Sequence, residues 1–215
     1  REGIAKHKTI FDKPDKEFKY KQPTLEAQIV NLADEIAYDS HDLDDGITAN
    51  LISERQLLEV KIWREVYEPL SKKIFAKEIL KYQTVKSLIN LTVTDLITES
   101  EKRLGNIQNI EQVRKAEALI SFSQEIIKQR KELKKFLFKN LYSHYRVVRM
   151  MDKAQRFIKQ LFEIYLEKPK QLSFSCQQKI KEQGLERTIC DYIAGMTDRF
   201  ALEEYKKLFD PYEKV

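Results

Sequence analysis

Apolar side chains recur every three or four residues along most of the chain, which is the spacing that places them on one side of an α-helix. The clearest such stretch begins after Pro23 and continues to about residue 45. Its apolar positions are Leu25, Ile29, Leu32, Ala33, Ile36 and Ala37. Thr24 stands where an N-cap residue is expected, because its hydroxyl can accept a hydrogen bond from the first turn. We therefore predict an amphipathic helix from residue 25.

Further helices are predicted along the rest of the chain. Ser53, with Gln56 three positions later, forms the sequence signature of a capping box. It predicts a helix over residues 53–70 that Pro69 limits. The other helical patterns cover residues 71–104, which Gly105 and Asn106 end, then 123–141, 144–167 and 186–209. Since no stretch shows the alternation of a strand, we expect an all-α fold, a multi-helix bundle read as one domain.

The composition agrees with a helical, folded chain. Hydrophobic residues make up 42% and charged residues 34% of the 215 positions, with only 5 Gly and 5 Pro, which excludes the disordered class. No stretch approaches the roughly 18 apolar residues of a membrane span, and the first residues lack the apolar centre of a signal peptide. We therefore expect a cytoplasmic protein without membrane contact. Cys176 and Cys190, which have no His or Cys cluster beside them, are expected to be reduced packing residues.

The net charge of +5 is compatible with an anionic partner but does not require one. The densest basic run covers residues 128–139, where lysines share one helix face beside two aromatic residues. These residues are Lys128, Lys131, Lys135 and Lys139, with Phe136 and Phe138 alongside. Such a face can attract nucleotides or single-stranded DNA through phosphate contacts and stacking. It can equally be a solvated surface over a hydrophobic seam, and we favour that interpretation.

Several common enzyme classes are excluded because their motifs are absent. The sequence contains no Gly-rich phosphate loop, no Walker-type GK[ST], no GxSxG elbow and no paired-Cys metal spacing. The candidate chemistry lies instead on the helix that begins at residue 25. At about 100° per residue, its polar side chains form one stripe. The stripe contains Asn31, Asp34, Tyr38, His41 and Asp45, and Asp42 lies beside it.

Two interpretations of this stripe remain open on spacing alone. The first is a solvated acidic helix face. In the second, Asp34 is a metal ligand, and Tyr38 and Asp42, one and two turns further, hold a substrate at the metal. A carboxylate oxygen is a hard donor that suits Mg²⁺ or Mn²⁺, but one carboxylate cannot hold the ion alone. The remaining ligands would have to come from elsewhere.

The segment ADEIAYDSHDLDDGI, residues 33–47, resembles the signature of the dGTPase-like branch of the HD phosphohydrolase superfamily. Residues 142–169 and 187–209 resemble C-terminal segments of the same family, so the resemblance covers nearly the whole chain. It implies a deoxynucleoside triphosphate triphosphohydrolase, which cleaves a dGTP-like dNTP to a deoxynucleoside and triphosphate. By this resemblance, residues 1–50 are the end of the HD catalytic domain and residues 51–215 its C-terminal helical region.

Carried over residue by residue, the resemblance implies that Asp34 is the last metal ligand of the family's site, with Mg or Mn as the ion. It implies that Tyr38 and Asp42 contact the deoxyribose or the phosphates of the dNTP, and it gives His41 a weaker supporting role. The resemblance also implies a homo-oligomer, because ring-like assemblies are typical of this family.

The family's first His and its His-Asp doublet are absent from this sequence. His7 and His144 do not sit in those motifs, and neither is followed by Asp. The chain also begins at Arg1 rather than at Met, so we expect it to be part of a longer enzyme and to be inactive alone. The alternative is a non-catalytic helical module for protein interaction or nucleic-acid binding. In residues 191–200, a second strong match, we expect the polar side chains to brace the fold rather than to bind substrate.

Overall fold

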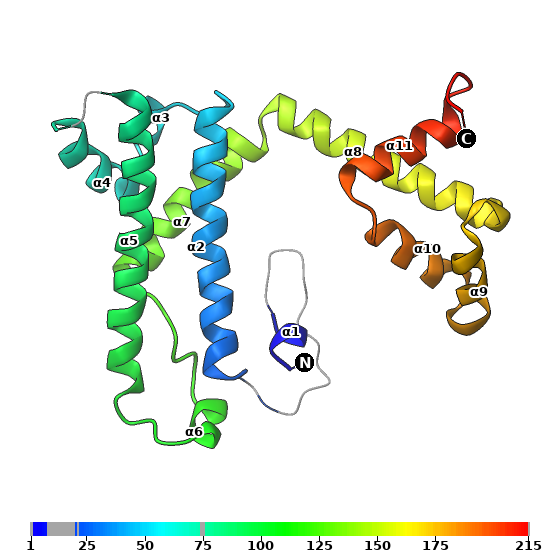
Figure 1. The fold of residues 1–215 in the computed structure, drawn as a ribbon. Helices are drawn as coiled ribbons and strands as arrows, with labels where there is room; N and C mark the ends of the chain where they lie inside the picture. Colours follow the sequence, from blue (N-terminus) through cyan, green and yellow to red (C-terminus); the bar gives the residue numbers. More distant parts are fainter. Residues whose placement is uncertain (1, 8–19, 21, 74–75, 215) are drawn as a thin grey trace. The chain divides into compact units, whose positions relative to one another are not determined.

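The computed structural model describes residues 2–7, 20, 22–73 and 76–214. Helices and their connections make up these residues, and no strand occurs among them, which confirms the all-α class (Figure 1). The chain divides into two compact units, Arg1–His144 and Tyr145–Val215, where the sequence pattern suggested one domain. The expected boundary at residue 50 falls inside the first unit. The assignment of residues 1–50 to a catalytic domain stays a prediction.

The first unit is built around two long helices that lie side by side, with a third crossing them (Figure 1). Its helices are α1 (Glu2–Ala5), α2 (Leu25–Thr48), α3 (Glu54–Leu57), α4 (Lys61–Ser71), α5 (Lys77–Leu104), α6 (Ile110–Lys115) and α7 (Gln124–Leu137), followed by a π-helical turn (Phe138–Tyr142). α2 packs against α5, and α4 packs against both α5 and α7. The fully buried side chains of this core include Leu43, Leu57, Ile62, Trp63, Leu133 and Leu137.

Local signals predict some helix boundaries correctly and others wrongly. The capping box is confirmed, since the Ser53 backbone N–H donates to Gln56 Oε1 at 2.9 Å and the Gln56 N–H donates to Ser53 Oγ at 3.3 Å. The single helix expected over 53–70 is wrong, because the chain turns at residues 58–60 between α3 and α4. Pro69 lies inside α4, which ends two residues later at Ser71. At that position its missing N–H removes only one hydrogen bond from the last turn.

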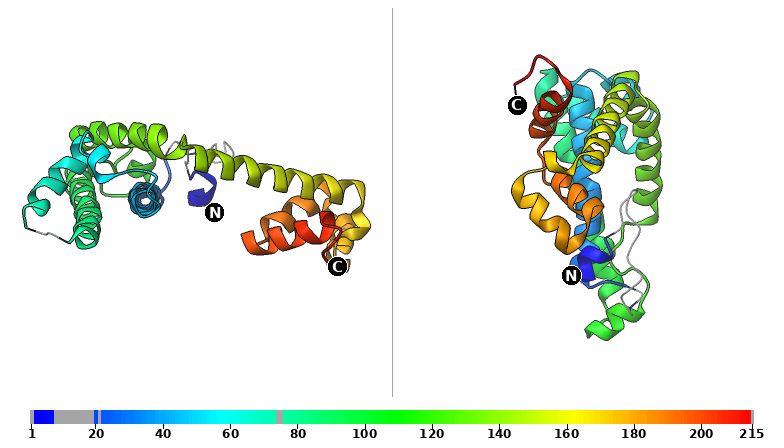
Figure 2. Two further views of the ribbon diagram at one scale, coloured as in Figure 1. Left: turned by 90° about the horizontal axis from the view of Figure 1, so that it is seen from above. Right: turned by 90° about the vertical axis from the view of Figure 1, so that its right-hand side faces the viewer.

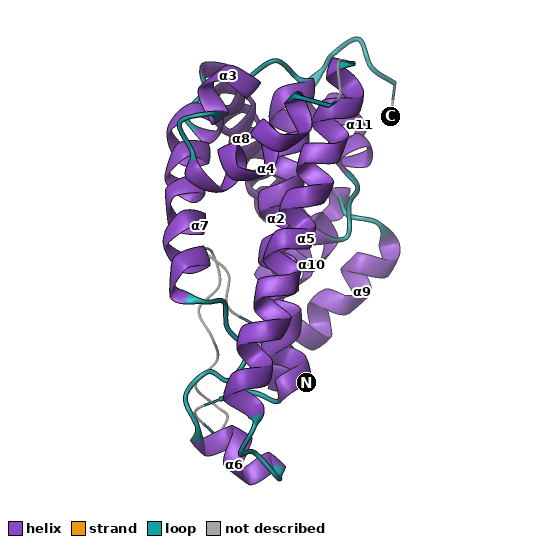
Figure 3. Ribbon diagram, turned by 90° about the vertical axis from the view of Figure 1, so that its left-hand side faces the viewer, coloured by secondary structure: helices purple, strands orange, loops and turns teal. Residues whose placement is uncertain are grey.

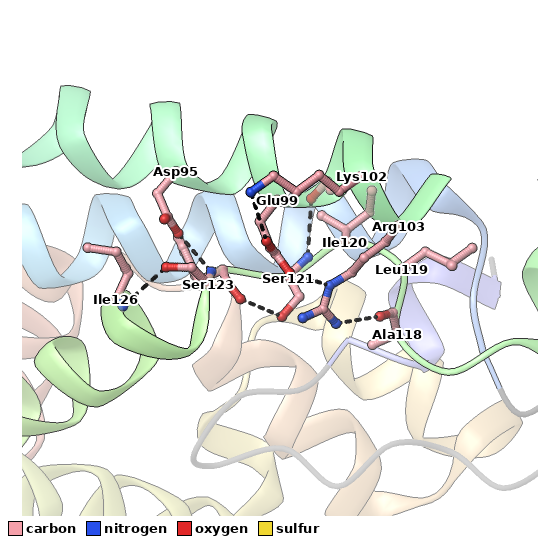
Figure 4. A network of polar contacts seen from close by, with 12 residues as sticks. Asp95, Glu99, Lys102, Arg103, Ala118, Leu119, Ile120, Ser121, Ser123 and Ile126 are labelled. Atoms are coloured by element: carbon pink, nitrogen blue, oxygen red, sulfur yellow. Dashed lines mark hydrogen bonds and ion pairs between the residues drawn. The ribbon is translucent and has the colours of Figure 1, made fainter. Parts of the chain in front are cut away.

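The connection from α6 to α7 is attached to the inner side of α5 by hydrogen bonds, as Figure 4 shows. The Ser123 N–H, at the N-cap of α7, donates to Asp95 Oδ2 at 2.8 Å, and the Ser121 N–H donates to Ser100 Oγ at 3.2 Å. From the other side, the buried Gln28 of α2 accepts backbone hydrogen bonds from residues 119 and 120. These contacts satisfy backbone groups that would otherwise be buried without partners.

The second unit is a smaller cluster in which α10 and α11 pack on the long helix α8 and α9 packs on α10 (Figure 2). Its elements are α8 (Tyr145–Glu167), a 3₁₀ turn (Pro169–Gln171), α9 (Phe174–Gln183), α10 (Leu185–Ala194) and α11 (Asp198–Phe209). Leu161, Tyr165, Leu172 and Ile189 form its core. The continuous helix expected over 186–209 is wrong, because α10 ends at Ala194. Thr197 then caps a new helix, since its Oγ1 accepts a hydrogen bond from the Phe200 N–H at 3.2 Å.

Side chains of residues 191–200 make contacts inside this unit. The Tyr192 ring packs edge-on against Tyr165, and Asp191 pairs with Arg187 at 2.9 Å on the same helix. The Tyr192 ring contact joins two helices, as the expected bracing role requires, whereas the Asp191–Arg187 pair is exposed and lies within one helix. Cys176 and Cys190 are free thiols. Within the described part of the chain, no helix combines the length and apolar character that crossing a bilayer requires.

Candidate functional site

The outer face of α2 carries the polar stripe that the sequence pattern predicts. Ile36 and Leu43 of α2 face the core, and the opposite side of this helix is exposed. On that side the side chains of Asp34, Tyr38, His41 and Asp45 are all exposed, and Asn31 lies half-buried at its edge. The helical periodicity therefore brings Asp34 and Tyr38 to one accessible surface. The Asp34 side chain is 59% exposed, and no described Lys or Arg side chain forms an ion pair with it.

His7 lies beside Asp34, although spacing along the chain gives it no role. Its Nε2 atom is 3.7 Å from Asp34 Oδ2, and its Nδ1 atom is hydrogen-bonded to Asn31 Oδ1. Because an amide oxygen can only accept, Nδ1 carries the proton in this contact, and a neutral ring then presents the Nε2 lone pair to the space next to Asp34. The Nε2 lone pair of His7 and the carboxylate of Asp34, both possible metal-ligand atoms, thus lie close together at the open face of α2.

Asp42 points to a different partner. Its carboxylate is half-buried and accepts a hydrogen bond from the Tyr142 hydroxyl in the π-helical turn. Burial raises the pKa of Asp42, and the Tyr142 hydrogen bond offsets part of that rise. The pKa of Tyr142 is raised in turn, first by burial and then by the bond to Asp42, with a further contribution from nearby Tyr38. Asp42 and Tyr142 are therefore in contact, and Tyr142 is a residue that the sequence pattern did not single out.

Two other acidic residues of α2 are structural. Asp39 and Arg130 are both more than 90% buried, and Arg130 Nη2 donates to Asp39 Oδ2 at 2.8 Å and to Glu35 Oε2 at 3.1 Å. Lys134 Nζ contacts Glu35 Oε2 at 2.6 Å. Burial raises the pKa of Asp39 by more than Arg130 lowers it. Burial also acts to raise the pKa of Glu35, but Lys134 and Arg130 outweigh it and hold that pKa below its usual value. This network joins α2 to α7.

The basic run on α7 is only partly a solvent-facing surface. The four lysines expected on one face, Lys128, Lys131, Lys135 and Lys139, are all exposed. Of the two aromatic residues beside them, Phe138 is 67% exposed and Phe136 is buried in the core, as the favoured interpretation of a solvated surface over a hydrophobic seam predicts for Phe136. Lys131, Lys135 and Phe138 border a hollow of about 650 Å³ between α7, α2 and the connection before α7.

The described residues do not contain a complete metal site. Nowhere among them do three or more His, Cys, Asp or Glu side chains gather in a way that could hold an ion. Asp34 and His7 offer two donors at the open face of α2, and divalent ions in proteins take four or more ligands. Asp34 is exposed and has no ion pair with a described Lys or Arg, which suits a ligand, but any ion there would need donors from outside the described residues.

Comparison with known proteins identifies relatives over the whole chain. The family model described as the phosphohydrolase-associated domain matches residues 120–207. A protein of Geobacter sulfurreducens named deoxyguanosinetriphosphate triphosphohydrolase-like protein is 45% identical over all of this chain and 58% of its own length. A protein of the same name from Bordetella pertussis is 40% identical over 98% of this chain and 57% of its own length. The chain thus spans a little over half the length of these relatives.

Proposed function

Because the chain belongs to the family of deoxyguanosinetriphosphate triphosphohydrolase-like proteins, we propose that the protein containing it hydrolyses a dNTP to a deoxynucleoside and triphosphate with the help of Mg²⁺ or Mn²⁺. One observation carries the proposal. Asp34, the residue that matches the family's last metal ligand, stands exposed on the open face of α2, with His7 Nε2 3.7 Å away and no described Lys or Arg paired with it. Asp39, by contrast, is buried and paired with Arg130, so its charge serves the fold.

In this proposal α2 contributes one side of the site. Asp34 supplies one oxygen ligand, and His7 Nε2 lies 3.7 Å from its carboxylate. A divalent ion bound there would supply an activated water and neutralise charge on the phosphate. The other ligands would come from outside the described residues.

Tyr38 and Asp42 would hold the nucleotide next to Asp34. The Tyr38 side chain is about half exposed, so its ring can cover the deoxyribose while its hydroxyl reaches a sugar or phosphate oxygen. Asp42 keeps acceptor capacity beyond the bond from Tyr142, because a carboxylate has about four lone-pair sites. Tyr142 is thus a positioning residue that holds the Asp42 carboxylate in place.

The test uses the protein as its gene encodes it. Release of tripolyphosphate from dGTP with Mn²⁺ is compared for the wild type, Asp34→Asn and Asp45→Asn, together with the amount of bound Mn²⁺. Asp45 is the matched control, since it is an exposed aspartate on the same face of α2 with no assigned role. We expect Asp34→Asn to lower kcat at least about a hundredfold and to reduce bound metal, while Asp45→Asn changes little. Equal rates for the wild type and Asp34→Asn would refute the metal role.

A second candidate function is binding of single-stranded nucleic acid by α7. The observation in its favour is the exposed Phe138 ring next to Lys131 and Lys135 at the hollow beside α7, a combination that permits stacking and phosphate contacts. The double variant Lys131→Glu/Lys135→Glu should then weaken binding of a fluorescent oligothymidylate and reduce its salt dependence. Binding that is absent in the wild type, or unchanged in the variant, would exclude this function.

A further inference from the structure

α7 ends in a π-helical turn, Phe138–Tyr142. α7 itself is a continuous helix that crosses α2 (Figures 1 and 3). In the turn the Ser143 N–H donates to the carbonyl oxygen of Phe138, five positions back, at 3.1 Å. A turn closed in this way holds one residue more than an α-helical turn, so each later side chain falls back by about 100° around the helix axis. Turns of this kind are rare in proteins and occur often at functional sites.

The side of α7 that faces α2 is marked by two ion pairs. Arg130 Nη2 donates to Asp39 Oδ2 at 2.8 Å. Lys134 Nζ contacts Glu35 Oε2 at 2.6 Å. Counted at 100° per residue from Leu133, which is buried in the core, Arg130 lies at about 60° and Lys134 at about 100°. The interval between these two angles is therefore the direction of α2.

Without the additional residue of the π-helical turn, Tyr142 would point away from α2. An uninterrupted α-helix would place Tyr142 at about 180° from Leu133, on the side opposite the core. The π-helical turn moves Tyr142 back to about 80°, which is within the interval that faces α2. Leu141 moves in the same way from about 80° to about −20°, toward the core. The structure has both side chains there, since the Tyr142 hydroxyl donates to Asp42 Oδ2 and Leu141 is only 6% exposed.

The turn also packs closely on α2, one helical turn beyond Asp42. Gly46 of α2 has no side chain, and a Cβ there would lie 3.1 Å from Leu141 Cδ1. That distance is shorter than ordinary van der Waals contact, so the absence of a side chain at Gly46 lets Leu141 approach the helix this closely. The packing of Leu141 on Gly46 thereby keeps Tyr142 within reach of Asp42.

Polar side chains add hydrogen bonds that stabilise the turn. Asn140 Nδ2 donates to the carbonyl oxygen of Phe136 at 3.0 Å. Ser143 Oγ donates to the carbonyl oxygen of Phe138 at 2.8 Å. Carbonyl groups in the last turn of a helix lack a regular helical partner, so donors from side chains favour this ending. Asn140 and Ser143 therefore influence Tyr142 through the backbone of the turn.

The acidic side chains of α2 that α7 and its π-helical turn hold differ in their donors. Glu35 and Asp39 pair with cations, whereas Asp42 accepts from the Tyr142 hydroxyl. Burial and the bond to Asp42 raise the pKa of Tyr142, so its hydroxyl keeps the proton that it donates. A neutral donor fixes the carboxylate but leaves its charge and its other lone pairs for a ligand such as a sugar hydroxyl.

We propose that the π-helical turn is part of the nucleotide site, because its additional residue aims Tyr142 at Asp42, and that Asn140 is a positioning residue for this contact. The link to the nucleotide rests on the proposed function, in which Asp42 holds the dNTP. The aim of Tyr142 rests on the register of the helix alone.

The first experiment changes the length of the turn in the protein as its gene encodes it and follows the thermal midpoint. Deletion of the exposed Lys139 removes the additional residue and leaves an α-helical turn in which Tyr142 keeps its direction. Insertion of one Ala after Lys139 instead turns Tyr142 by about 100°, away from Asp42. Tyr142→Phe should therefore lower the midpoint by roughly 2–6 °C in the wild type and in the deletion variant, but not in the insertion variant.

The deletion variant decides the outcome whether or not the insertion variant folds. A deletion variant in which Tyr142→Phe leaves the midpoint unchanged, or one that fails to fold, would overturn the proposal. An equal effect of Tyr142→Phe in the insertion variant would overturn it as well, because the direction of Tyr142 would then not depend on the turn.

The second experiment tests Asn140 through KM and kcat for dGTP with Mn²⁺. Asn140→Ala should raise KM about three- to tenfold with a smaller change in kcat, because the affected contact holds the nucleotide before and during the reaction. Asn140→Ser should restore most of the loss, since a hydroxyl can donate to the carbonyl four residues back, as Thr84 does to Leu80 at 2.8 Å. Asn106→Ala is the matched control, because Asn106 is an exposed asparagine outside the turn.

Combination with Tyr142→Phe shows whether Asn140 acts through Tyr142. The double variant Asn140→Ala/Tyr142→Phe should have a KM no higher than that of Tyr142→Phe alone, because both changes remove the same contact. Losses that multiply in the double variant would overturn the positioning role. The same holds for an Asn140→Ser variant that is as impaired as Asn140→Ala.

The two experiments distinguish this inference from the proposed function. A protein that does not cleave dGTP, but whose thermal midpoints follow the expected pattern, would refute the function and leave the aim of Tyr142 standing. An active protein in which the deletion abolishes the effect of Tyr142→Phe would do the reverse.

Discussion

Replacement of Arg130 by Met tests whether the network between α2 and α7 is essential for stability. Met keeps much of the length of the side chain but removes its charge from a site where both Arg130 and Asp39 are more than 90% buried. At the 2.8 Å separation of Nη2 and Oδ2, the attraction amounts to about 6 kcal/mol with an effective dielectric constant near 20. That attraction is offset by the cost of burying both charges. Without Arg130, the burial cost of Asp39 stands alone, and we expect a loss of about 3–5 kcal/mol.

Two further variants separate the charge from the packing. Arg130→Met/Asp39→Asn leaves no charge at the buried position and should recover more than half of the loss. Lys134→Met removes only a half-exposed partner of Glu35 and should cost no more than about 0.5 kcal/mol. The loss in Arg130→Met should also shrink at low pH. Burial raises the pKa of Asp39 in the folded state, so protonation favours folding, and this gain is lost as pH rises through the folded-state pKa.

The assay is urea unfolding followed by the fluorescence of Trp63. This is the only tryptophan of the chain and is fully buried in the core of the first unit, so its signal reports the unit that contains the network. With a denaturant slope of about 1–3 kcal/mol per molar, the midpoint should fall by roughly 2 M in Arg130→Met. A midpoint that moves no further than in Lys134→Met, or a loss equal at pH 7.5 and pH 4.5, would refute the reasoning.

Three further predictions concern packing, hydrogen bonding and capping. Gly46→Ala should destabilise the protein by about 1 kcal/mol in thermal unfolding, because a Cβ there would lie 3.0 Å from the Ile52 side chain. This crowding outweighs the gain in helix propensity. A raised thermal midpoint would contradict the prediction. Tyr142→Phe should cost about 1–2 kcal/mol at pH 7 and less at pH 4, because the lost bond stabilises the charged form of Asp42, and urea unfolding at both pH values checks it. Ser53→Ala should cost about 1 kcal/mol through loss of the capping box, and an unchanged urea midpoint would show that the cap contributes nothing.

The helices could be predicted from the sequence where a local signal marks their ends. The capping box at Ser53 is such a signal, and it stands where the sequence placed it. Thr197 is also a local signal, because it is the N-cap of α11. The helical spacing of apolar residues continues across 186–209, so the sequence pattern did not reveal this boundary. The start of α4 has no side-chain cap, since Val60 occupies the N-cap position. A boundary of that kind is determined by how the helix packs on α5 and α7, which the sequence alone does not reveal.

The candidate site was predictable as far as it lies on one helix. The period of α2 places Asp34 and Tyr38 on one face, and the structure has them there. Partners from distant parts of the chain could not be found in this way. His7 reaches Asp34 from the segment after α1, Tyr142 reaches Asp42 across 100 positions of sequence, and Arg130 reaches Asp39 across 91. These meetings depend on tertiary packing rather than on spacing. The metal-ligand role of Asp34 and the substrate contacts of Tyr38 and Asp42 stay predictions.

The burial of α7 has a practical consequence for work on pieces of this protein. The phosphohydrolase-associated segment begins at residue 120 and so includes α7, whose apolar side is part of the core of the first unit. A recombinant fragment trimmed to that segment would strip Leu133, Phe136 and Leu137 of their neighbours and would be prone to aggregate. Cutting between His144 and Tyr145 follows the packing instead and gives the C-terminal helices the better prospect of remaining in solution.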